Sequence, residues 1–183
     1  MRSESVRLLV PKRHSDSRGH FFEIYSKKNF FEHGIDVEFV QDNHSLSISA
    51  GTLRGLHFQA PPHAQAKLVW CTRGAIFDVA VDIRIGSPNF GQWQGFELTA
   101  KNGNQLYVPI GFAHGFMTLE PNSEISYKCS DYYAPDFEGA VSWNDPDLGI
   151  SWPIKEQPIL SPKDNLAMML RQIKSPFIYG ENS

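Results

Sequence analysis

Short segments in which apolar and polar residues alternate run through most of the chain, separated by turn-forming residues. The clearest segment runs from Ala75 to Arg84, where every second residue up to Ile83 is apolar and the residues between them are mixed. A period of two is typical of a β-strand whose two faces have different surroundings. Further strands are predicted over residues 38–41, 43–49, 52–59, 67–72, 92–99, 104–108, 115–119 and 123–130. Many short strands at close spacing favour a sandwich or a barrel.

Helical signals occur in two places. Residues 26–33 predict a short helix with Ser26 as its N-cap and Gly34 as its stop. Near the C-terminus Ser161 precedes Pro162, as an N-cap precedes the first residue of a helix. Good helix formers and an apolar stripe over residues 165–173 predict that this helix continues. No linker or repeat divides the chain, so we expect one all-β domain over residues 1–183 with a C-terminal helix.

The composition is that of an ordinary globular protein, with 41% hydrophobic and 20% charged residues. A net charge of −3 gives no general attraction to nucleic acid or to anionic membranes. No apolar run approaches the roughly 20 residues of a membrane-spanning helix, and Met1 to Arg7 contain no apolar core of a secretion signal. Cys71 and Cys129 both lie in predicted strands, where buried free thiols are favoured over a disulfide. We expect a cytoplasmic protein that binds neither nucleic acid nor membranes.

Two motifs, one around His57 and one around His114, resemble those of cupin barrels. The cupin patterns are G-x5-H-x-H-x(3,4)-E-x6-G and G-x5-P-x-G-x2-H. His57 and His114 occupy two of the usual metal-ligand positions. Gln59 occupies the second histidine position, and Lys67, counted back from Gly74, occupies the glutamate position. Metal sites need several neutral imidazoles and carboxylates, and an ammonium group repels the ion. The resemblance therefore implies a cupin-like jelly roll, a double-stranded β-helix, with no metal and with a pocket suited to proton transfer.

A longer series of motifs makes the resemblance specific. The series is Asp16-Ser-Arg-Gly-His-Phe-Phe-Glu23, Gln41-Asp-Asn-His-Ser45, Leu53-Arg-Gly-Leu-His-Phe-Gln59, Lys67-Leu-Val69, Phe77-Asp-Val-Ala-Val-Asp-Ile-Arg84, Pro109-Ile-Gly-Phe-Ala-His-Gly-Phe116, Tyr127-Lys128 and Asp131-Tyr-Tyr-Ala-Pro135. In this order it resembles the dTDP-4-dehydrorhamnose 3,5-epimerase family over about residues 5–165. The resemblance implies a dTDP-linked 4-keto-6-deoxyhexose as substrate, whose ketone acidifies the C–H bonds at C3 and C5. Inversion requires a base, an acid on the opposite face and stabilisation of the enolate. It needs no cofactor, and no glycine-rich dinucleotide loop is present.

The resemblance gives catalytic roles to five residues. His57 is the expected base, because an imidazole titrates near working pH, and Asp164 is expected to orient it. Tyr127 is the expected acid. Lys67 is expected to stabilise the enolate oxygen, and Tyr133 to act in substrate placement or in the C5 step. Each residue also has a structural alternative to its catalytic role. His57 would be a hydrogen-bonded core histidine, and Asp164 a carboxylate in the first turn of a helix. Lys67 would be an exposed strand lysine, and the two tyrosines would be packing residues.

Eight further residues are expected to bind the substrate, and guanidinium groups in particular suit phosphate oxygens. They are Arg18, Arg54 and Lys163 for the nucleotide and diphosphate, Glu23, Gln41 and Asn43 for the base and sugar, and Gln59 and His114 for the sugar pocket. Solvated surface charge is the alternative for the basic residues, and a remnant of the metal site for His114. The resemblance also implies that Arg18 and Glu23 reach a neighbouring subunit's site through an exchanged N-terminal strand, so we expect a homodimer.

The expected function is cofactor-independent epimerisation of dTDP-4-keto-6-deoxyglucose at C3 and C5 to dTDP-4-keto-L-rhamnose. Relatives that invert only C3 or only C5 keep most of these residues. The chain also departs from the family pattern Pro-x-x-Glu-Arg-Gly, because Gly139 follows Glu138, and no role is carried over to that glutamate. Sugar 3,4-ketoisomerases are cupins that commonly keep a histidine pair where this chain has His57 and Gln59. A metal-dependent oxygenase and a non-catalytic sugar-nucleotide binder are the remaining alternatives.

Overall fold

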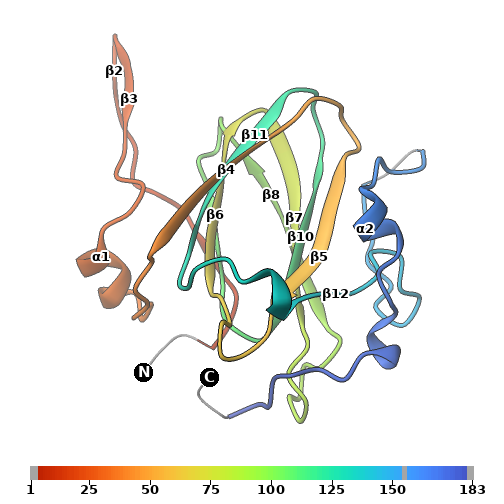
Figure 1. Cartoon of the computed structure of the whole chain (residues 1–183). Coiled ribbons are helices and arrows are strands. Elements are labelled where there is room, and N and C mark those ends of the chain that lie inside the picture. Colours follow the sequence, from red (N-terminus) through yellow and green to blue (C-terminus); the bar gives the residue numbers. More distant parts are fainter. Residues whose placement is uncertain (1–3, 154–155, 181–183) are drawn as a thin grey trace.

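Two five-stranded sheets face each other across the centre of the molecule (Figure 1). The computed structural model describes residues 4–153 and 156–180, so residues 1–3 of the N-terminal segment considered above lie outside the described residues. The first sheet contains, in spatial order, β1 (Arg7–Leu9), β9 (Gln105–Val108), β6 (Lys67–Arg73), β11 (Ser123–Cys129) and β4 (Gln41–Ser47). The second contains β12 (Glu138–Ala140), β5 (Leu53–Gln59), β10 (Phe112–Thr118), β7 (Ala75–Asp82) and β8 (Trp93–Thr99). Neighbouring strands are antiparallel throughout, which confirms the expected cupin-like jelly roll.

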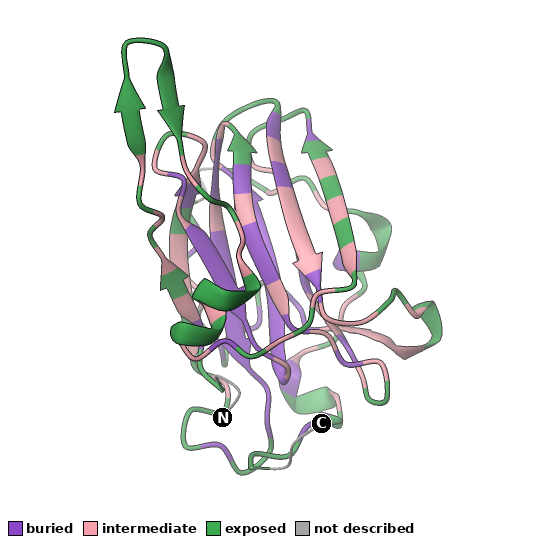
Figure 2. Ribbon diagram, turned by 90° about the vertical axis from the view of Figure 1, so that its left-hand side faces the viewer, coloured by how far each residue is buried: buried purple, intermediate pink, exposed green. Residues whose placement is uncertain are grey.

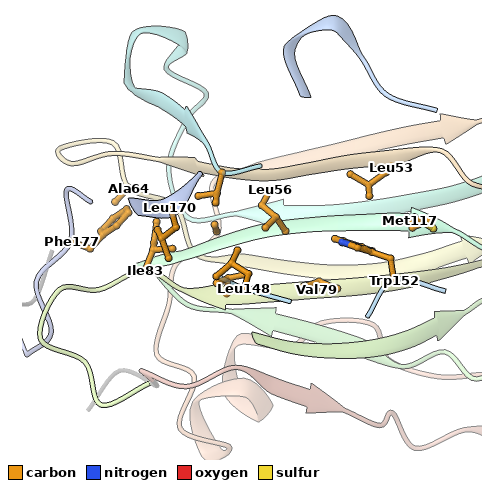
Figure 3. Packing of buried hydrophobic residues seen from close by; sticks show 13 residues of the cluster. Leu53, Leu56, Ala64, Val79, Ile83, Met117, Leu148, Trp152, Leu170 and Phe177 are labelled. Atoms are coloured by element: carbon orange, nitrogen blue, oxygen red, sulfur yellow. The ribbon is translucent and has the colours of Figure 1, made fainter. Parts of the chain in front are cut away.

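The two faces of β7 have different roles in this architecture. Its mixed face, with Ile76, Asp78 and Ala80, points between the sheets, and its two apolar members join a cluster with residues of both sheets. Its uniformly apolar face, with Val79 and Val81, lies on the outer side of the second sheet. That side is covered by the C-terminal part of the chain, in a cluster that includes Leu148, Trp152, Leu170 and Phe177 (Figure 3). The more polar face of the strand is therefore the interior one, which leaves room for ionisable groups inside the barrel.

The outer side of the first sheet is covered by helix α1 (Lys27–Glu32) and the segment that follows it. Ser26 caps the helix, since its hydroxyl accepts a hydrogen bond from the Asn29 amide, and Gly34 follows with φ 76°. Ile35 and Phe39 then pack beneath it with strand residues such as Leu68. Residues 38–40 were predicted to form part of a strand, but they belong to the segment that covers the sheet. Strand β4 begins only at Gln41.

The C-terminal helix is much shorter than the sequence pattern predicts. Helix α2 (Pro162–Asn165) has the expected Ser161 cap, but it ends before the apolar stripe begins. The stripe instead forms a bridge from Met168 to Val141 and a 3₁₀ turn, η2 (Leu170–Gln172). Leu170 is buried in the cluster outside the second sheet. Burial of these side chains against the sheet outweighs their helical propensity, which is a weak preference. No helix within the described parts of the chain is long and apolar enough to cross a membrane.

An N-terminal hairpin, formed by β2 (His14–Asp16) and β3 (Gly19–Phe21), projects from the barrel (Figures 1 and 2). All six of its strand residues are exposed. The sequence did not predict these strands, because their residues are polar and do not alternate. The short elements η1 (Pro135–Phe137) and β12, which follows it, were missed for the same reason.

Candidate active site

A cavity of about 400 Å³ opens into the space between the sheets and is bordered by the segment that leads into α2. Four of the five expected catalytic residues and two of the expected binding residues line it, namely His57, Lys67, Tyr127, Asp164, Arg54 and His114. The rest of the lining is formed by Ser45, Thr52, Leu53, Phe116, Ile125, Ile159, Leu160 and Ser161. Residues from five strands and from the C-terminal segment thus meet at one place.

His57 on β5 and Asp164 on α2 form a hydrogen-bonded pair at the cavity wall. The distance from His57 Nε2 to Asp164 Oδ1 is 2.5 Å, and Asp164 is buried. Ser161 donates its hydroxyl to Asp164 Oδ2 and also accepts from the Asp164 amide. Burial by itself would raise the pKa of Asp164, but hydrogen bonds from His57 and Ser161 outweigh it, and this pKa lies below its usual value. An ionised carboxylate only accepts hydrogen bonds, so Nε2 carries the hydrogen and Nδ1 is free to take up a proton.

Gly55 allows β5 and β10 to approach closely beside this pair. Its φ is 128°, and a Cβ at this position would lie 2.5 Å from the Gly115 Cα. The pairing of the two strands shifts next to this contact, between His114 and Phe116. As a result His114 lies directly opposite His57, and both rings line the cavity. The glycine thereby serves the site rather than a turn.

Lys67 and Tyr127 line the cavity from the neighbouring strands β6 and β11. Burial lowers the pKa of the Lys67 ammonium, although the nearby Cys129, Glu138 and Asp78 oppose this effect. Within residues 4–153 and 156–180 the Lys67 Nζ has no hydrogen bond or salt bridge. Burial raises the pKa of the Tyr127 phenol, which keeps it protonated at neutral pH. The cavity therefore holds a cation without a fixed partner and a proton donor.

Replacement of Lys67 by Met is expected to stabilise the fold by about 1 kcal/mol at neutral pH, because a half-buried ammonium group loses part of its hydration on folding. The folded-state pKa of Lys67 lies below the unfolded value of about 10.4, so this cost is complete below the folded-state pKa and disappears as the pH rises towards the unfolded value. The advantage of the variant should thus shrink between neutral pH and pH ~10. Urea unfolding of both proteins across this range measures it. A variant less stable than the parent at neutral pH would contradict the prediction.

Tyr133 lies outside the cavity lining and belongs to a separate cluster with Glu138 and Lys163. Its hydroxyl donates to Glu138 Oε2 over 3.0 Å, and this interaction raises the pKa of the phenol. Lys163 forms an ion pair with the other carboxylate oxygen. Sequence reasoning gave Glu138 no role, and its only signal was its place in the family motif. The cluster is joined to the His57–Asp164 pair by the chain itself, since Lys163 directly precedes Asp164.

The three amide residues expected near the base and sugar hold loop 131–134 and one another. Gln59, expected in the sugar pocket, does not line the cavity. It is buried, and its amide bonds the backbone of His63, Tyr132 and Ala134. Gln41 accepts from the Tyr133 amide over 2.9 Å and donates to Asn43 Oδ1 over 3.0 Å. These side chains are largely occupied by protein groups, and none of them lines the cavity.

The remaining basic and acidic candidates differ in position. Arg54 lines the cavity and donates to the Ser47 hydroxyl over 3.2 Å and to the Leu46 carbonyl over 3.3 Å. Arg18 lies at the tip of the projecting hairpin, where it pairs with Asp16 at 2.6 Å. The Glu23 carboxylate accepts a hydrogen bond of 2.6 Å from the side-chain amide of Asn29. Neither Arg18 nor Glu23 lines the cavity of its own chain.

Comparison with known proteins identifies the family. The family model for dTDP-4-dehydrorhamnose 3,5-epimerase matches residues 2–172. The dTDP-4-dehydrorhamnose 3,5-epimerase of Salmonella typhimurium is 53% identical over 168 residues, which are 91% of each chain. The crystal structure of a 3,5-epimerase from Legionella pneumophila, in complex with dTDP-4-keto-L-rhamnose, gives a TM-score of 0.91 at 44% identity and covers 100% of this chain and 98% of that one. A 3′-monoepimerase from Streptomyces bikiniensis, in complex with dTDP-quinovose, gives 0.86 at 38% identity and covers 93% of this chain and 88% of its own. The chain therefore belongs to the dTDP-4-dehydrorhamnose 3,5-epimerase family of isomerases.

Proposed function

We propose that this protein inverts C3 and C5 of dTDP-4-keto-6-deoxyglucose and so forms dTDP-4-keto-L-rhamnose, without a cofactor. The observation that carries the proposal is the meeting of a His57–Asp164 pair with Lys67 and Tyr127 in one cavity. These groups are the base, the cation and the acid that double inversion beside a ketone requires. The family match and the ligand of the Legionella relative support the choice of substrate.

In this mechanism His57 Nδ1 removes the proton from C3 or C5, and the electron pair of the C–H bond moves into an enolate centred on the C4 oxygen. Asp164 stabilises the imidazolium that forms, as the carboxylate does in other His–carboxylate pairs. Lys67 interacts with the enolate oxygen, whose charge develops only as the proton leaves. An ammonium group without a fixed partner among the described residues is available for this task.

Proton delivery on the opposite face completes inversion. Tyr127 lies on the facing sheet and is protonated at neutral pH, so it is the proposed donor. Tyr133 is proposed to place the substrate at the rim rather than to exchange protons, because its hydroxyl is bound to Glu138 outside the cavity. Arg18 and Glu23 are proposed to bind substrate in the cavity of a second subunit, since the hairpin that carries Arg18 projects from its own barrel (Figure 1). The proposed active protein is a homodimer.

Replacement of Arg54 by Ala is expected to raise KM about 10- to 100-fold and to change kcat much less. Its proposed partner is the diphosphate, whose charge stays the same during enolisation, so Arg54 binds ground state and transition state alike. Steady-state kinetics with the purified variant measures both constants. Arg73, an exposed arginine that does not line the cavity, gives a matched control as Arg73→Ala. A large loss of kcat at unchanged KM would place Arg54 in the chemistry instead.

Solvent deuterium exchange tests the whole proposal. The protein is incubated with dTDP-4-keto-6-deoxyglucose in deuterated buffer, and the sugar protons are followed by NMR. Uptake at both C3 and C5, with inversion at both, is the expected result. The likeness to a 3′-monoepimerase favours one alternative, inversion at a single carbon, and uptake at only one carbon would support it. If the protein were a 3,4-ketoisomerase, the NMR spectrum would show the ketone at a different carbon of the sugar. If no deuterium entered the sugar at all, the protein would be a sugar-nucleotide binder without catalytic activity.

A further inference from the structure

The carboxylate of Asp78 is only half satisfied in the interior of the barrel. Asp78 is 0% exposed, and its Oδ1 accepts a hydrogen bond of 2.8 Å from His114 Nε2. Its Oδ2 is buried and has no hydrogen-bond partner within the described residues. A buried carboxylate oxygen without a partner destabilises the fold, so its presence calls for a reason beyond packing.

Asp82, four residues further along β7, shows how the fold treats a structural carboxylate. It is also buried, at 1% exposure. Its Oδ1 accepts from the backbone and side chain of Arg84, and its Oδ2 accepts from Arg84 and Ser87. Both of its oxygens are therefore used. Among residues 4–153 and 156–180 no arginine contacts Asp78 in this way, and its one hydrogen-bond partner there is His114.

The position of Asp78 connects it to the cavity through His114. Strand β10 lies between β7 and β5, and it places His114 directly opposite His57. Because the carboxylate accepts, His114 Nε2 carries the hydrogen in this bond. Its Nδ1 has no hydrogen-bond partner in the part of the chain that the structure describes. The cavity thus contains two histidines side by side, each held by its own carboxylate.

We propose that Asp78 is a positioning residue for the part of the cavity around His114 and Lys67, where the sugar of the proposed substrate binds. Its Oδ1 holds the His114 ring towards the sugar, and its charge balances the Lys67 ammonium. The inference rests on the proposed epimerase function and adds a residue to it. His114 then meets the sugar in one orientation, without a choice of ring rotamers. Lys67 keeps a nearby negative charge that forms no direct bond with it, so the ammonium group remains free for the enolate oxygen.

The charges around Lys67 set the sign of the expected pH effect. Burial, and to a smaller extent Lys163 on α2, disfavours the ammonium form of Lys67, whereas Glu138 on β12, Asp78 on β7 and, once it has lost its proton, Cys129 on β11 favour that form. The other titratable or charged groups that line the cavity are Arg54, His57, His114, Tyr127 and Asp164. Removal of the Asp78 charge takes away one of the favourable terms, so Lys67 should lose its proton at a lower pH than in the parent protein.

The test uses Asp78→Asn, which keeps the shape of the side chain and removes its charge. We expect kcat to fall about 10- to 100-fold, less than the 10²–10³-fold typical of deleting an oxyanion donor, with KM changed far less. Deuterium uptake at C3 and C5 should fall together, because one enolate site serves both carbons. The high-pH limb of the kcat profile should move to lower pH. An unchanged kcat, or an unmoved limb, would overturn the proposal.

Asp82→Asn is the matched control on the same strand. It should lower the melting temperature by breaking the Arg84 and Ser87 contacts, yet leave kcat of the folded protein and its pH profile unchanged. Should Asp78→Asn not fold, ¹⁵N NMR of the parent histidines decides, and a hydrogen on His114 Nδ1 rather than Nε2 would overturn the assignment. A parent protein that exchanges no deuterium would refute the epimerase function itself. Exchange by the parent with equal exchange by Asp78→Asn would refute only the role of Asp78.

Discussion

His57→Asn is expected to lose deuterium exchange at both C3 and C5, by about 10²–10⁴-fold, while dTDP still binds. Asparagine cannot take up a proton at neutral pH, but its amide can still donate to Asp164, so the variant should fold. Loss at both carbons is expected because His57, held by Asp164 from α2, is the single proposed base, whereas His114 is assigned to positioning the sugar. NMR exchange rates and calorimetric binding of dTDP measure the two effects separately.

Asp164→Asn tests whether His57 and Asp164 act as a unit. The double variant should then lose little more activity than His57→Asn alone, since residues that act together are not additive. His63 provides a matched control, because it pairs with Asp131 at 3.1 Å and does not line the cavity. His63→Asn should keep normal exchange. Near-normal exchange at either carbon in His57→Asn would mean that another base serves that carbon.

Tyr127→Phe is expected to separate proton removal from proton delivery. The ring and its packing stay, so stability should change little, and only the hydroxyl is lost. His57 should still remove a proton and return solvent deuterium to the original face. Net inversion should therefore fall by about 10²-fold or more, while exchange falls far less. Stereochemical analysis of the product beside its deuterium content measures both.

Equal loss of exchange and inversion in Tyr127→Phe would show instead that the hydroxyl is needed to form the enolate. Full inversion would make Tyr133 or a water molecule the donor. Tyr132→Phe is a suitable control, because Tyr132 is 65% exposed and does not line the cavity. Its kinetics should match those of the parent protein.

Much of the barrel could be predicted because strand formation leaves a local signal. The alternation from Ala75 to Ile83 predicts β7, and turn residues such as Gly74 mark where strands end. Motif spacing also singled out His57 and Lys67, and the family resemblance added Tyr127; all three line one cavity. The hairpin that contains Arg18 escaped prediction because its strands are polar and exposed, so no pattern of burial is written into them.

What the sequence by itself determined is most of the long strands of the barrel, the family and the residue types that the chemistry requires. Only the tertiary structure decided which of these residues meet. Asp164 reaches His57 across 107 residues because the C-terminal segment packs on the second sheet, and the same packing ends α2 after four residues. It also turned Gln59 towards a loop and left Asp78 Oδ2 without a hydrogen-bond partner among the described residues. Alternation and capping act between neighbours along the chain, whereas these contacts depend on strand order and register, which the whole barrel sets together.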